Sequence, residues 1–266
     1  MLACTAPVIR PQTLRDALRA RADRPDATVL AGGTDVMVYI EAGVLRPSAV
    51  IDLWGCHGLR GIEVRGNELR IGATTTHSDV ARDPRVPAVL RESALTVGAV
   101  QIQNRGTVGG NICNSSPAGD TLPVWLALDA DFQLSSVRGT RRVAAADYWQ
   151  GYKQTALAAD ELLTAIYLPD VEGEAHFRKV GTRMAQAISK VIFCGRRSQG
   201  VARLAFGAVG PVPLRVRAAE DALAAGAPVS EVVRLVREGI VPIDDVRSTR
   251  DYRARVAGNV VGRWLG

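Results

Sequence analysis

TVGGNICNSSPAGD, residues 107–120, is the stretch of the sequence that decides the fold. It lies between LRESALTVGAVQIQNR at 90–105 and the apolar run LPVWLALDA at 122–130, which is predicted to be helical. Most of its residues are small or polar, and none is charged before Asp120. Connections between elements commonly need only about two to six residues. We therefore expect a long loop of small residues that is shaped to hold a ligand.

The overall composition is typical of a soluble globular protein. The chain has 266 residues, a length that is enough for one large or two ordinary domains. Of these residues, 47% are hydrophobic and 23% are charged. No apolar run approaches the length of a membrane span, and no leader pattern opens the sequence, so we expect a cytoplasmic protein without a membrane span. The formal net charge is +6, but the arginines are scattered and aromatic residues make up only 5%. This pattern argues against nucleic-acid binding and favours an anionic cofactor or an acidic partner.

The cysteines and histidines do not form a metal-binding pattern. The cysteines are far apart and include no C-x-x-C pair, so neither a zinc nor an iron–sulfur site is expected in this chain. We interpret them as buried or incidental thiols. The histidines lack metal-like spacing and are expected to be structural or exposed. These residues are Cys4, Cys56, Cys113, Cys194, His57, His77 and His176.

The N-terminal third predicts a small parallel βαβ unit. Residues 11–24 have apolar positions at helical spacing, with Thr13 as the expected N-cap. Residues 27–35 and 48–53 are expected to form short buried strands, and 35–43 the helix between them.

The pattern changes after Trp54. Alternating residues predict β-hairpins over 61–73 and 131–148, and 161–169 predicts a strand. Residues 170–174, DVEGE, are the best candidate for a linker. Beyond them, three successive strands followed by three helices predict a separate α+β domain. The strands are expected within 175–183, 188–195 and 202–210, and the helices within 215–226, 229–239 and 248–265.

A glycine-containing bend also occurs at 30–36, LAGGTDV, and we call it the first bend because it precedes 107–120 in the chain. A strand is expected to end at Ala31 and a helix to begin near Asp35, so successive backbone N–H groups could bind an anion. Glycine suits such a bend because it lets a phosphate approach the backbone. Neither G-x-G-x-x-G nor G-x-x-x-x-G-K-[ST] occurs, which argues against the Rossmann and Walker patterns. Together, the two bends could hold a ligand with a diphosphate, a sugar chain and a flat ring. The alternative is an ordered loop that satisfies its own backbone.

The two bends also carry a family resemblance. AGGTDV (31–36) and TVGGNICNSSPAGDTLPVWLALDA (107–130) resemble the flavoprotein subunit of molybdenum-containing hydroxylases, a family that includes xanthine dehydrogenases and aerobic carbon monoxide dehydrogenases. The segments FRKVGTRMAQAISKV, AFGAVGPVPLR and PIDDVRSTRDYRARVAG, at 177–191, 205–215 and 242–258, resemble its C-terminal domain. The resemblance covers nearly the whole chain in the expected order.

The resemblance implies an α+β fold with two domains. The first, over 1–169, would be an FAD-binding domain of the vanillyl-alcohol-oxidase (PCMH) type, with subdomains of about 1–53 and 54–169. The second, over 175–266, would have a three-stranded antiparallel sheet packed with helices.

The resemblance also implies which residues bind FAD. The first bend would wrap the diphosphate, Asp120 would bond a polar group of the sugar or adenosine side, and Lys179 would stabilise negative charge on the reduced ring. Because Arg178 adjoins Lys179, the match to the family's lysine is open by one position. Without the resemblance, Lys179 would be interpreted as an exposed lysine on a strand. No catalytic residue is implied. The implied FAD-binding residues are Leu30, Ala31, Gly32, Gly33, Thr34, Asp35, Val36, Ala73, Ile102, Gly106, Thr107, Gly110, Asn111, Cys113, Asn114, Gly119, Asp120, Leu163 and Lys179.

The implied function is that of an electron-transfer subunit of an oxidoreductase. It would hold FAD non-covalently, take electrons from the [2Fe–2S] clusters of a small partner subunit, and pass them to NAD or another acceptor. Molybdopterin would lie on a large partner subunit. Two alternatives remain open: a self-contained flavin oxidase or reductase of the same fold, and an assembly subunit that binds no flavin.

Overall fold

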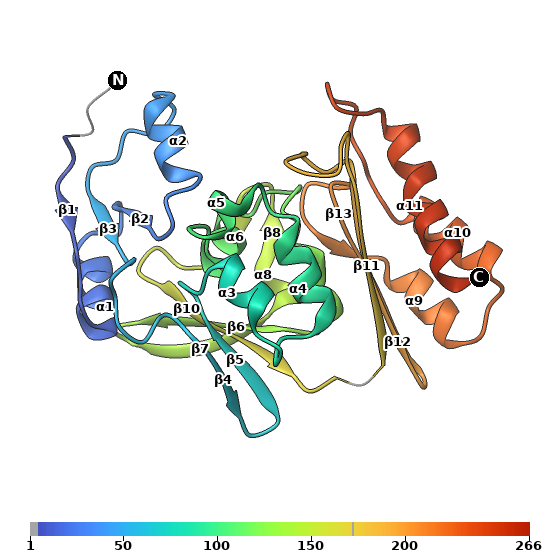
Figure 1. Ribbon diagram of the computed structural model, residues 1–266, viewed down its shortest axis with the longest axis horizontal. Coiled ribbons are helices and arrows are strands. Elements are labelled where there is room, and N and C mark those ends of the chain that lie inside the picture. The colour runs from blue at the N-terminus through green and yellow to red at the C-terminus, as the bar shows by residue number, and fades with distance from the viewer. Residues whose placement is uncertain (1–4, 172) are drawn as a thin grey trace.

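The computed structural model describes residues 5–171 and 173–266 (Figure 1). Near the N-terminus, a three-stranded parallel sheet has the order β1-β3-β2. The predicted βαβ unit is confirmed, and Thr13 caps its first helix by accepting a hydrogen bond from the backbone N–H of Asp16 at 3.2 Å. The short strand β1 was not predicted. The elements are β1 (Val8–Ile9), α1 (Leu14–Asp23), β2 (Thr28–Leu30), α2 (Val36–Glu41) and β3 (Val50–Asp52).

The middle of the chain forms a five-stranded antiparallel sheet with the order β4-β5-β10-β6-β7. Both predicted hairpins and the predicted strand are present, and the strand, β10, occupies the centre. The second hairpin was predicted to reach residue 148, but it ends at Ala144 and a short helix follows over Ala145–Tyr148. A small hairpin, β8–β9, was not predicted. The strands are β4 (Ile62–Arg65), β5 (Glu68–Gly72), β6 (Asp131–Ser136), β7 (Gly139–Ala144), β8 (Trp149–Gly151), β9 (Gln154–Thr155) and β10 (Leu162–Pro169).

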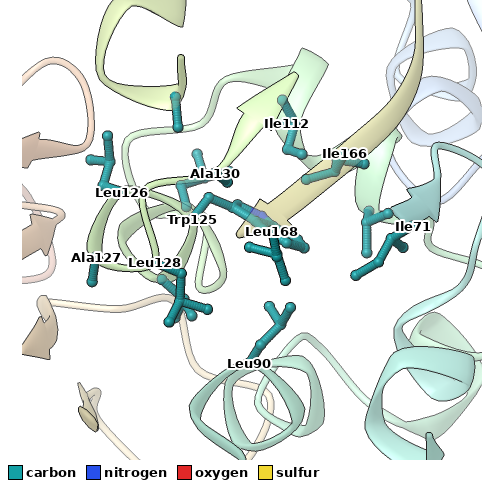
Figure 2. Packing of buried hydrophobic residues seen from close by; sticks show 14 of the residues in the cluster. Ile71, Leu90, Ile112, Trp125, Leu126, Ala127, Leu128, Ala130, Ile166 and Leu168 are labelled. Atoms are coloured by element: carbon teal, nitrogen blue, oxygen red, sulfur yellow. The ribbon is translucent and has the colours of Figure 1, made fainter. Parts of the chain in front are cut away.

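Short helices cover one face of this sheet (Figure 1). Side chains of the sheet, among them Ile71 and Leu168, meet Leu90, Ile112 and Trp125 of the helices in one apolar core (Figure 2). Every residue of α7 is buried, which is typical of a helix that is apolar on all sides. The helices are α3 (His77–Arg82), α4 (Ala88–Leu95), α5 (Val100–Gln103), α6 (Val108–Asn114), α7 (Leu122–Ala127) and α8 (Ala145–Tyr148).

The stretch 107–120 is only partly the loop that the sequence predicted. Its first half is helix α6, which begins after Thr107, whose hydroxyl accepts a hydrogen bond from the N–H of Gly110 at 3.1 Å. Packing overrides the low helix propensity of glycine here, because a Cβ on Gly109 would lie only 2.6 Å from the carbonyl oxygen of Ala73. The helix ends at Ser115, whose φ of 52° lies in the left-handed region. The loop is therefore shorter than predicted.

The C-terminal part is a four-stranded antiparallel sheet with three helices. The three predicted strands and three predicted helices are present, and the two-residue strand β14 is added at the edge. Of the predicted linker, Glu174 belongs to strand β11, Asp170, Val171 and Gly173 lie between β10 and β11, and residue 172 lies outside the described residues. The elements are β11 (Glu174–Val180), β12 (Val191–Ser198), β13 (Val201–Gly207), β14 (Leu214–Arg215), α9 (Arg217–Ala224), α10 (Val229–Glu238) and α11 (Arg250–Leu265).

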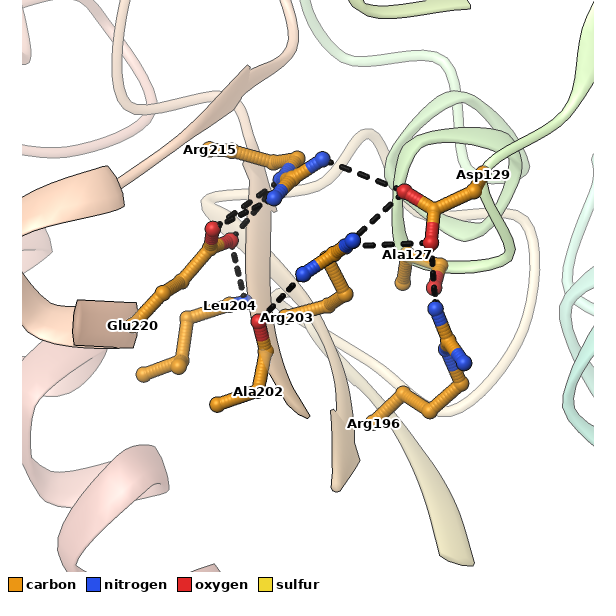
Figure 3. Close-up of polar contacts among 8 residues, drawn as sticks. All are labelled: Ala127, Asp129, Arg196, Ala202, Arg203, Leu204, Arg215 and Glu220. Atoms are coloured by element: carbon orange, nitrogen blue, oxygen red, sulfur yellow. Dashed lines mark hydrogen bonds and ion pairs between the residues drawn. The ribbon is translucent and has the colours of Figure 1, made fainter. Parts of the chain in front are cut away.

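Helix α7 joins the two halves of the molecule, because it packs against β12, β13 and β14. Directly after it, the carboxylate of Asp129 accepts hydrogen bonds from three arginines of the C-terminal sheet (Figure 3). Arg203 Nε lies 2.8 Å and Arg215 Nη1 lies 3.2 Å from Asp129 Oδ1, and Arg196 bonds Oδ2. Glu220 also pairs with Arg215. We call these five residues the Asp129 cluster.

Across 5–171 and 173–266, no helix is both long enough and apolar enough to cross a lipid bilayer.

Candidate functional site

A cleft of about 1300 Å³ opens between the N-terminal bends, helices α5 and α6, and loops of the C-terminal sheet. Its volume exceeds the roughly 300–1000 Å³ that is usual for small-molecule pockets. The cleft is therefore large enough for an extended ligand such as a dinucleotide.

The two glycine-containing bends meet at one wall of this cleft. A Cβ on Gly32 would lie 1.9 Å from the carbonyl oxygen of Arg105, so only glycine allows the two segments to touch. A Cβ on Gly106 would lie 3.4 Å from the Thr34 hydroxyl oxygen, which belongs to the first bend. Both bends therefore present backbone without bulky side chains to the same space.

The helices that follow the bends are also linked to each other. Asn114 Nδ2 donates to Asp35 Oδ2 at 3.1 Å and so connects the end of α6 to the start of α2. Burial raises the pKa of the Asp35 carboxyl, and the nearby Lys153 opposes this shift. The Thr121 hydroxyl donates to Asn111 Oδ1 at 2.8 Å, which orients the Asn111 amide.

Asp120 and Lys179 form a buried ion pair at the border between the two halves of the molecule. Lys179 Nζ donates to Asp120 Oδ2 at 2.5 Å and to the Thr96 carbonyl oxygen at 2.9 Å. The Ser189 hydroxyl donates to Asp120 Oδ1 at 2.7 Å. Burial raises the pKa of the Asp120 carboxyl, and Lys179 and Ser189 partly offset this effect by stabilising the charged form. Arg178, the neighbour that left the position of the lysine open, is exposed.

Arg253 of α11 organises the C-terminal wall of the cleft. Its guanidinium donates to the carbonyl oxygens of Lys190 and Ala208 at 2.7 and 2.9 Å, and to Asp245 Oδ1 at 2.8 Å. Burial raises the pKa of Asp245, but hydrogen bonds from the Arg247 and Ser248 backbone and from Arg253 outweigh it and hold that pKa at about 2. A buried arginine thus fixes three separate loops.

Most of the residues that the family resemblance implied are brought together by the structure. Leu30 and Lys179 do not line the cleft: Leu30 ends strand β2, and Lys179 reaches the site only through Asp120. The implied residues that do line it are Ala31, Gly32, Gly33, Thr34, Asp35, Val36, Ala73, Ile102, Gly106, Thr107, Gly110, Asn111, Cys113, Asn114, Gly119, Asp120 and Leu163.

Several lining residues were not predicted. Thr74 and His77 line the cleft, and His77 lies beside Gly106, although it had been expected to be only structural or exposed. The TTTH sequence at 74–77 could have indicated this segment, because it directly follows the implied contact Ala73. The C-terminal loops 186–189 and 241–247 also line the cleft, although the resemblance of these segments implied only the C-terminal domain and no ligand contact.

The chain belongs to the family of FAD-binding subunits of molybdenum hydroxylases. Residues 3–171 match the model of the FAD binding domain in molybdopterin dehydrogenase. Residues 176–266 match the model of the CO dehydrogenase flavoprotein C-terminal domain. The predicted family, α+β fold class, oxidoreductase role and FAD cofactor are thereby confirmed.

Individual relatives agree with this family. The putative xanthine dehydrogenase FAD-binding subunit of Escherichia coli K12 is 33% identical over 264 residues, which are 92% of this chain and 89% of that protein. The nicotinate dehydrogenase FAD-subunit of Eubacterium barkeri is 36% identical over 238 residues, or 83% and 79% of the two chains. A chain in the crystal structure of Cu,Mo-CO dehydrogenase superposes with a TM-score of 0.92 at 28% identity, covering 99% of this chain and 97% of that one.

The cleft fits FAD on the geometry of its own residues. At Gly32 and Gly109 a Cβ would collide with the backbone of Arg105 and Ala73, so glycine is what lets these segments pack together at the wall of the cleft. Thr74 Oγ1 is buried beside the cleft and has no hydrogen-bond partner among the residues that the structure describes. Such unused polar groups need explanation in a folded protein, and a polar ligand supplies one.

Proposed function

We propose that this chain carries electrons within a molybdenum hydroxylase complex, from the [2Fe–2S] clusters of a small partner subunit to NAD or another acceptor. The single observation that carries the proposal is the contact of Gly32 with Arg105, which brings both glycine bends to one cleft of dinucleotide size. Bound FAD would supply the redox chemistry, because it accepts electrons and releases them as hydride.

The residues of the cleft would divide the work of binding FAD non-covalently. Backbone N–H groups of the bends at 31–36 and 106–111 would hold the diphosphate. Asp120 would bond a polar group of the ligand, and the ion pair with Lys179 would keep its carboxylate charged and oriented. We also propose that the two domains meet at 170–174, between the FAD-binding half and the C-terminal sheet.

Partner subunits would supply the remaining cofactors. Relatives include the medium subunit of nicotine 6-hydroxylase and the medium chain of carbon monoxide dehydrogenase, and these names mark them as parts of larger enzymes. By the same relationship, this chain would assemble with a large molybdopterin subunit and a small [2Fe–2S] subunit. A cytoplasmic location stays part of this proposal.

Purification of the native complex tests the proposal. We expect a large and a small subunit to co-purify with the chain. Addition of substrate should bleach the flavin absorbance at about 450 nm only when both partner subunits are present. Substrate turnover by the isolated chain would favour a self-contained oxidase or reductase. A native complex with no flavin on this chain would favour an assembly subunit.

A substitution at Gly110 tests the placement of the diphosphate. A Cβ at this position would lie 2.9 Å from the Thr107 hydroxyl oxygen, so valine would crowd the bend and the N-cap of α6. We expect Gly110→Val to purify without FAD while keeping its far-ultraviolet circular dichroism. Gly55→Val is a matched control, because a Cβ on Gly55 meets nothing within 4 Å and Gly55 does not line the cleft. Full flavin content in Gly110→Val would contradict the assignment.

A further inference from the structure

His77 lies directly behind the point where the two glycine bends meet. Its backbone N–H donates to the Gly106 carbonyl oxygen at 3.0 Å. Its ring atom Cδ2 would lie 3.3 Å from a Cβ on Gly106, so this part of the imidazole lies against the bend, and the ring nitrogen bonded to Cδ2 is Nε2. The residue is only 2% exposed, yet it lines the cleft. The ring is therefore held in place by the fold and borders the space of the ligand.

Neither ring nitrogen of His77 is used by the rest of the described chain. Nδ1 is enclosed and has no hydrogen-bond partner among 5–171 and 173–266, and Nε2 makes no hydrogen bond with these residues either. An enclosed N–H without an acceptor is rarer in proteins than an enclosed acceptor without a donor. The tautomer that keeps its proton on Nε2 is therefore favoured, and it leaves one donor without a partner.

The wall around the glycine bends is short of positive charge. Among the described residues that line the cleft before the C-terminal sheet, none is lysine or arginine, and two, Asp35 and Asp120, are acidic. The arginines of the lining, Arg247 and Arg253, belong to the C-terminal wall. A diphosphate at the bends must therefore be bound by neutral donors.

We propose that His77, as a neutral imidazole, donates a hydrogen bond from Nε2 to a diphosphate oxygen of the bound FAD. This inference rests on the proposed placement of the diphosphate at the two bends. It adds a side-chain donor to the backbone N–H groups there. The neutral ring fits the site because an imidazolium would need acceptors at both nitrogens, and Nδ1 has none among the described residues.

The electrostatic surroundings agree with a neutral ring. Burial lowers the pKa of His77 to about 4, and no neighbouring charge contributes to this shift. On its own helix, Asp79 is engaged by Thr76 and Arg60. On the elements packed against it, Asp35 bonds Asn114, and Arg105 stacks on Trp54 with 3.6 Å between the guanidinium carbon and the ring centroid.

The test uses the full chain, freed of flavin, with FAD and ADP as probes. His77→Leu removes the donor, and His77→Gln keeps an N–H near the position of Nε2. We expect the Leu variant to bind FAD about 10- to 100-fold more weakly, as is usual for losing a hydrogen bond to a charged group. It should lose ADP affinity by a similar factor, while the Gln variant stays within about threefold of the wild type. Unaltered FAD binding by His77→Leu would overturn the proposal, and a loss confined to FAD would move the contact away from the diphosphate.

Two further measurements separate the possible reasons for failure. Urea unfolding of each apo variant reports stability, and if the Leu variant does not fold, His77→Asn takes its place because its amide mimics Nδ1 rather than Nε2. The dissociation constant of FAD from the wild-type protein should not change between pH 6 and 8. A rise in this constant of about tenfold per pH unit would show that an imidazolium makes the contact, which would contradict the proposal. If the wild type itself binds no FAD, the proposed function fails rather than this inference.

Discussion

Removing one charge from the Asp129 cluster should loosen the attachment of the C-terminal sheet. Asp129→Asn is the appropriate change, because the Asp129 φ of 51° is left-handed and asparagine tolerates that conformation. The substitution therefore removes the negative charge without new backbone strain. Three arginines then converge on a neutral amide.

The size of the effect follows from burial and from the bonds that remain. The exposed fractions are 30% for the Asp129 side chain and 6% for that of Arg196, so solvent screens the interaction only in part. Breaking a fully buried pair costs roughly 3–5 kcal/mol. Here Arg196 keeps the Ala127 carbonyl and Arg215 keeps Glu220, so we expect a loss of about 2–3 kcal/mol in unfolding free energy.

Thermal unfolding followed by circular dichroism measures this loss. For a chain of this size, about 2–3 kcal/mol corresponds to a fall in Tm of about 5–10 °C. The matched control is Glu238→Gln, which breaks an exposed ion pair with Arg234 on α10 and should leave Tm unchanged. If Asp129→Asn melts within about 1 °C of the wild type, the three arginines are satisfied without the carboxylate and the reasoning is refuted.

Two further substitutions probe the charges of the cleft. Lys179→Met leaves the Asp120 carboxylate, whose side chain is 8% exposed, without its cation, and should lower the unfolding free energy by about 3–5 kcal/mol at pH 7. Because burial already raises the pKa of Asp120, protonation of this carboxylate should shrink the loss of stability as pH falls toward about 4. Urea titrations of Lys179→Met, Asp120→Asn and the double variant test this, and strict additivity would contradict the pairing. For Asp245, the folded pKa of about 2 lies below the ordinary value of 3.8 for an aspartate, so its contribution to stability is complete above about pH 4 and is lost as pH falls toward 2. Thermal melts between pH 5 and 2 should therefore fall more steeply for the wild type than for Asp245→Asn, and parallel curves would show that Asp245 does not carry the effect.

Elements with a clear period were predictable from the sequence. The hairpin over 61–73 alternates around RGN, and the helices after residue 215 repeat their apolar positions at helical spacing. Strands β1 and β14 were missed because two residues show no period and are defined only by distant partners, as Val8 is by Val50. Helix α6 was missed because its paired glycines argue against a helix, and only packing against Ala73 explains it.

For the site, prediction succeeded where the ligand contacts lie in a continuous motif. The glycine bends could be read locally, because a phosphate-binding backbone needs small residues in sequence order. The partnership of Asp120 with Lys179 could not, since the two residues are 59 positions apart and meet only through the packing of β11. The C-terminal loops were missed for a related reason: Arg253 assembles them through two backbone carbonyl groups and through Asp245, and none of these contacts follows a local sequence pattern.

Helix α7 connects these observations, because charged residues anchor it to the C-terminal sheet at both ends. Asp120 precedes the helix and is held by Lys179 and Ser189. Asp129 follows the helix and is held by the three arginines of the Asp129 cluster. The apolar contacts of a helix that is buried on all sides do not fix its rotation about its own axis, and polar contacts at its two ends can fix that rotation. Only the Asp120 end borders the cleft. Asp129→Asn should therefore weaken the fold and leave the dissociation constant of FAD within about twofold, whereas Lys179→Met should change both. Equal effects on FAD binding from the two ends would mean that the helix moves as a whole and that the width of the cleft depends on both anchors.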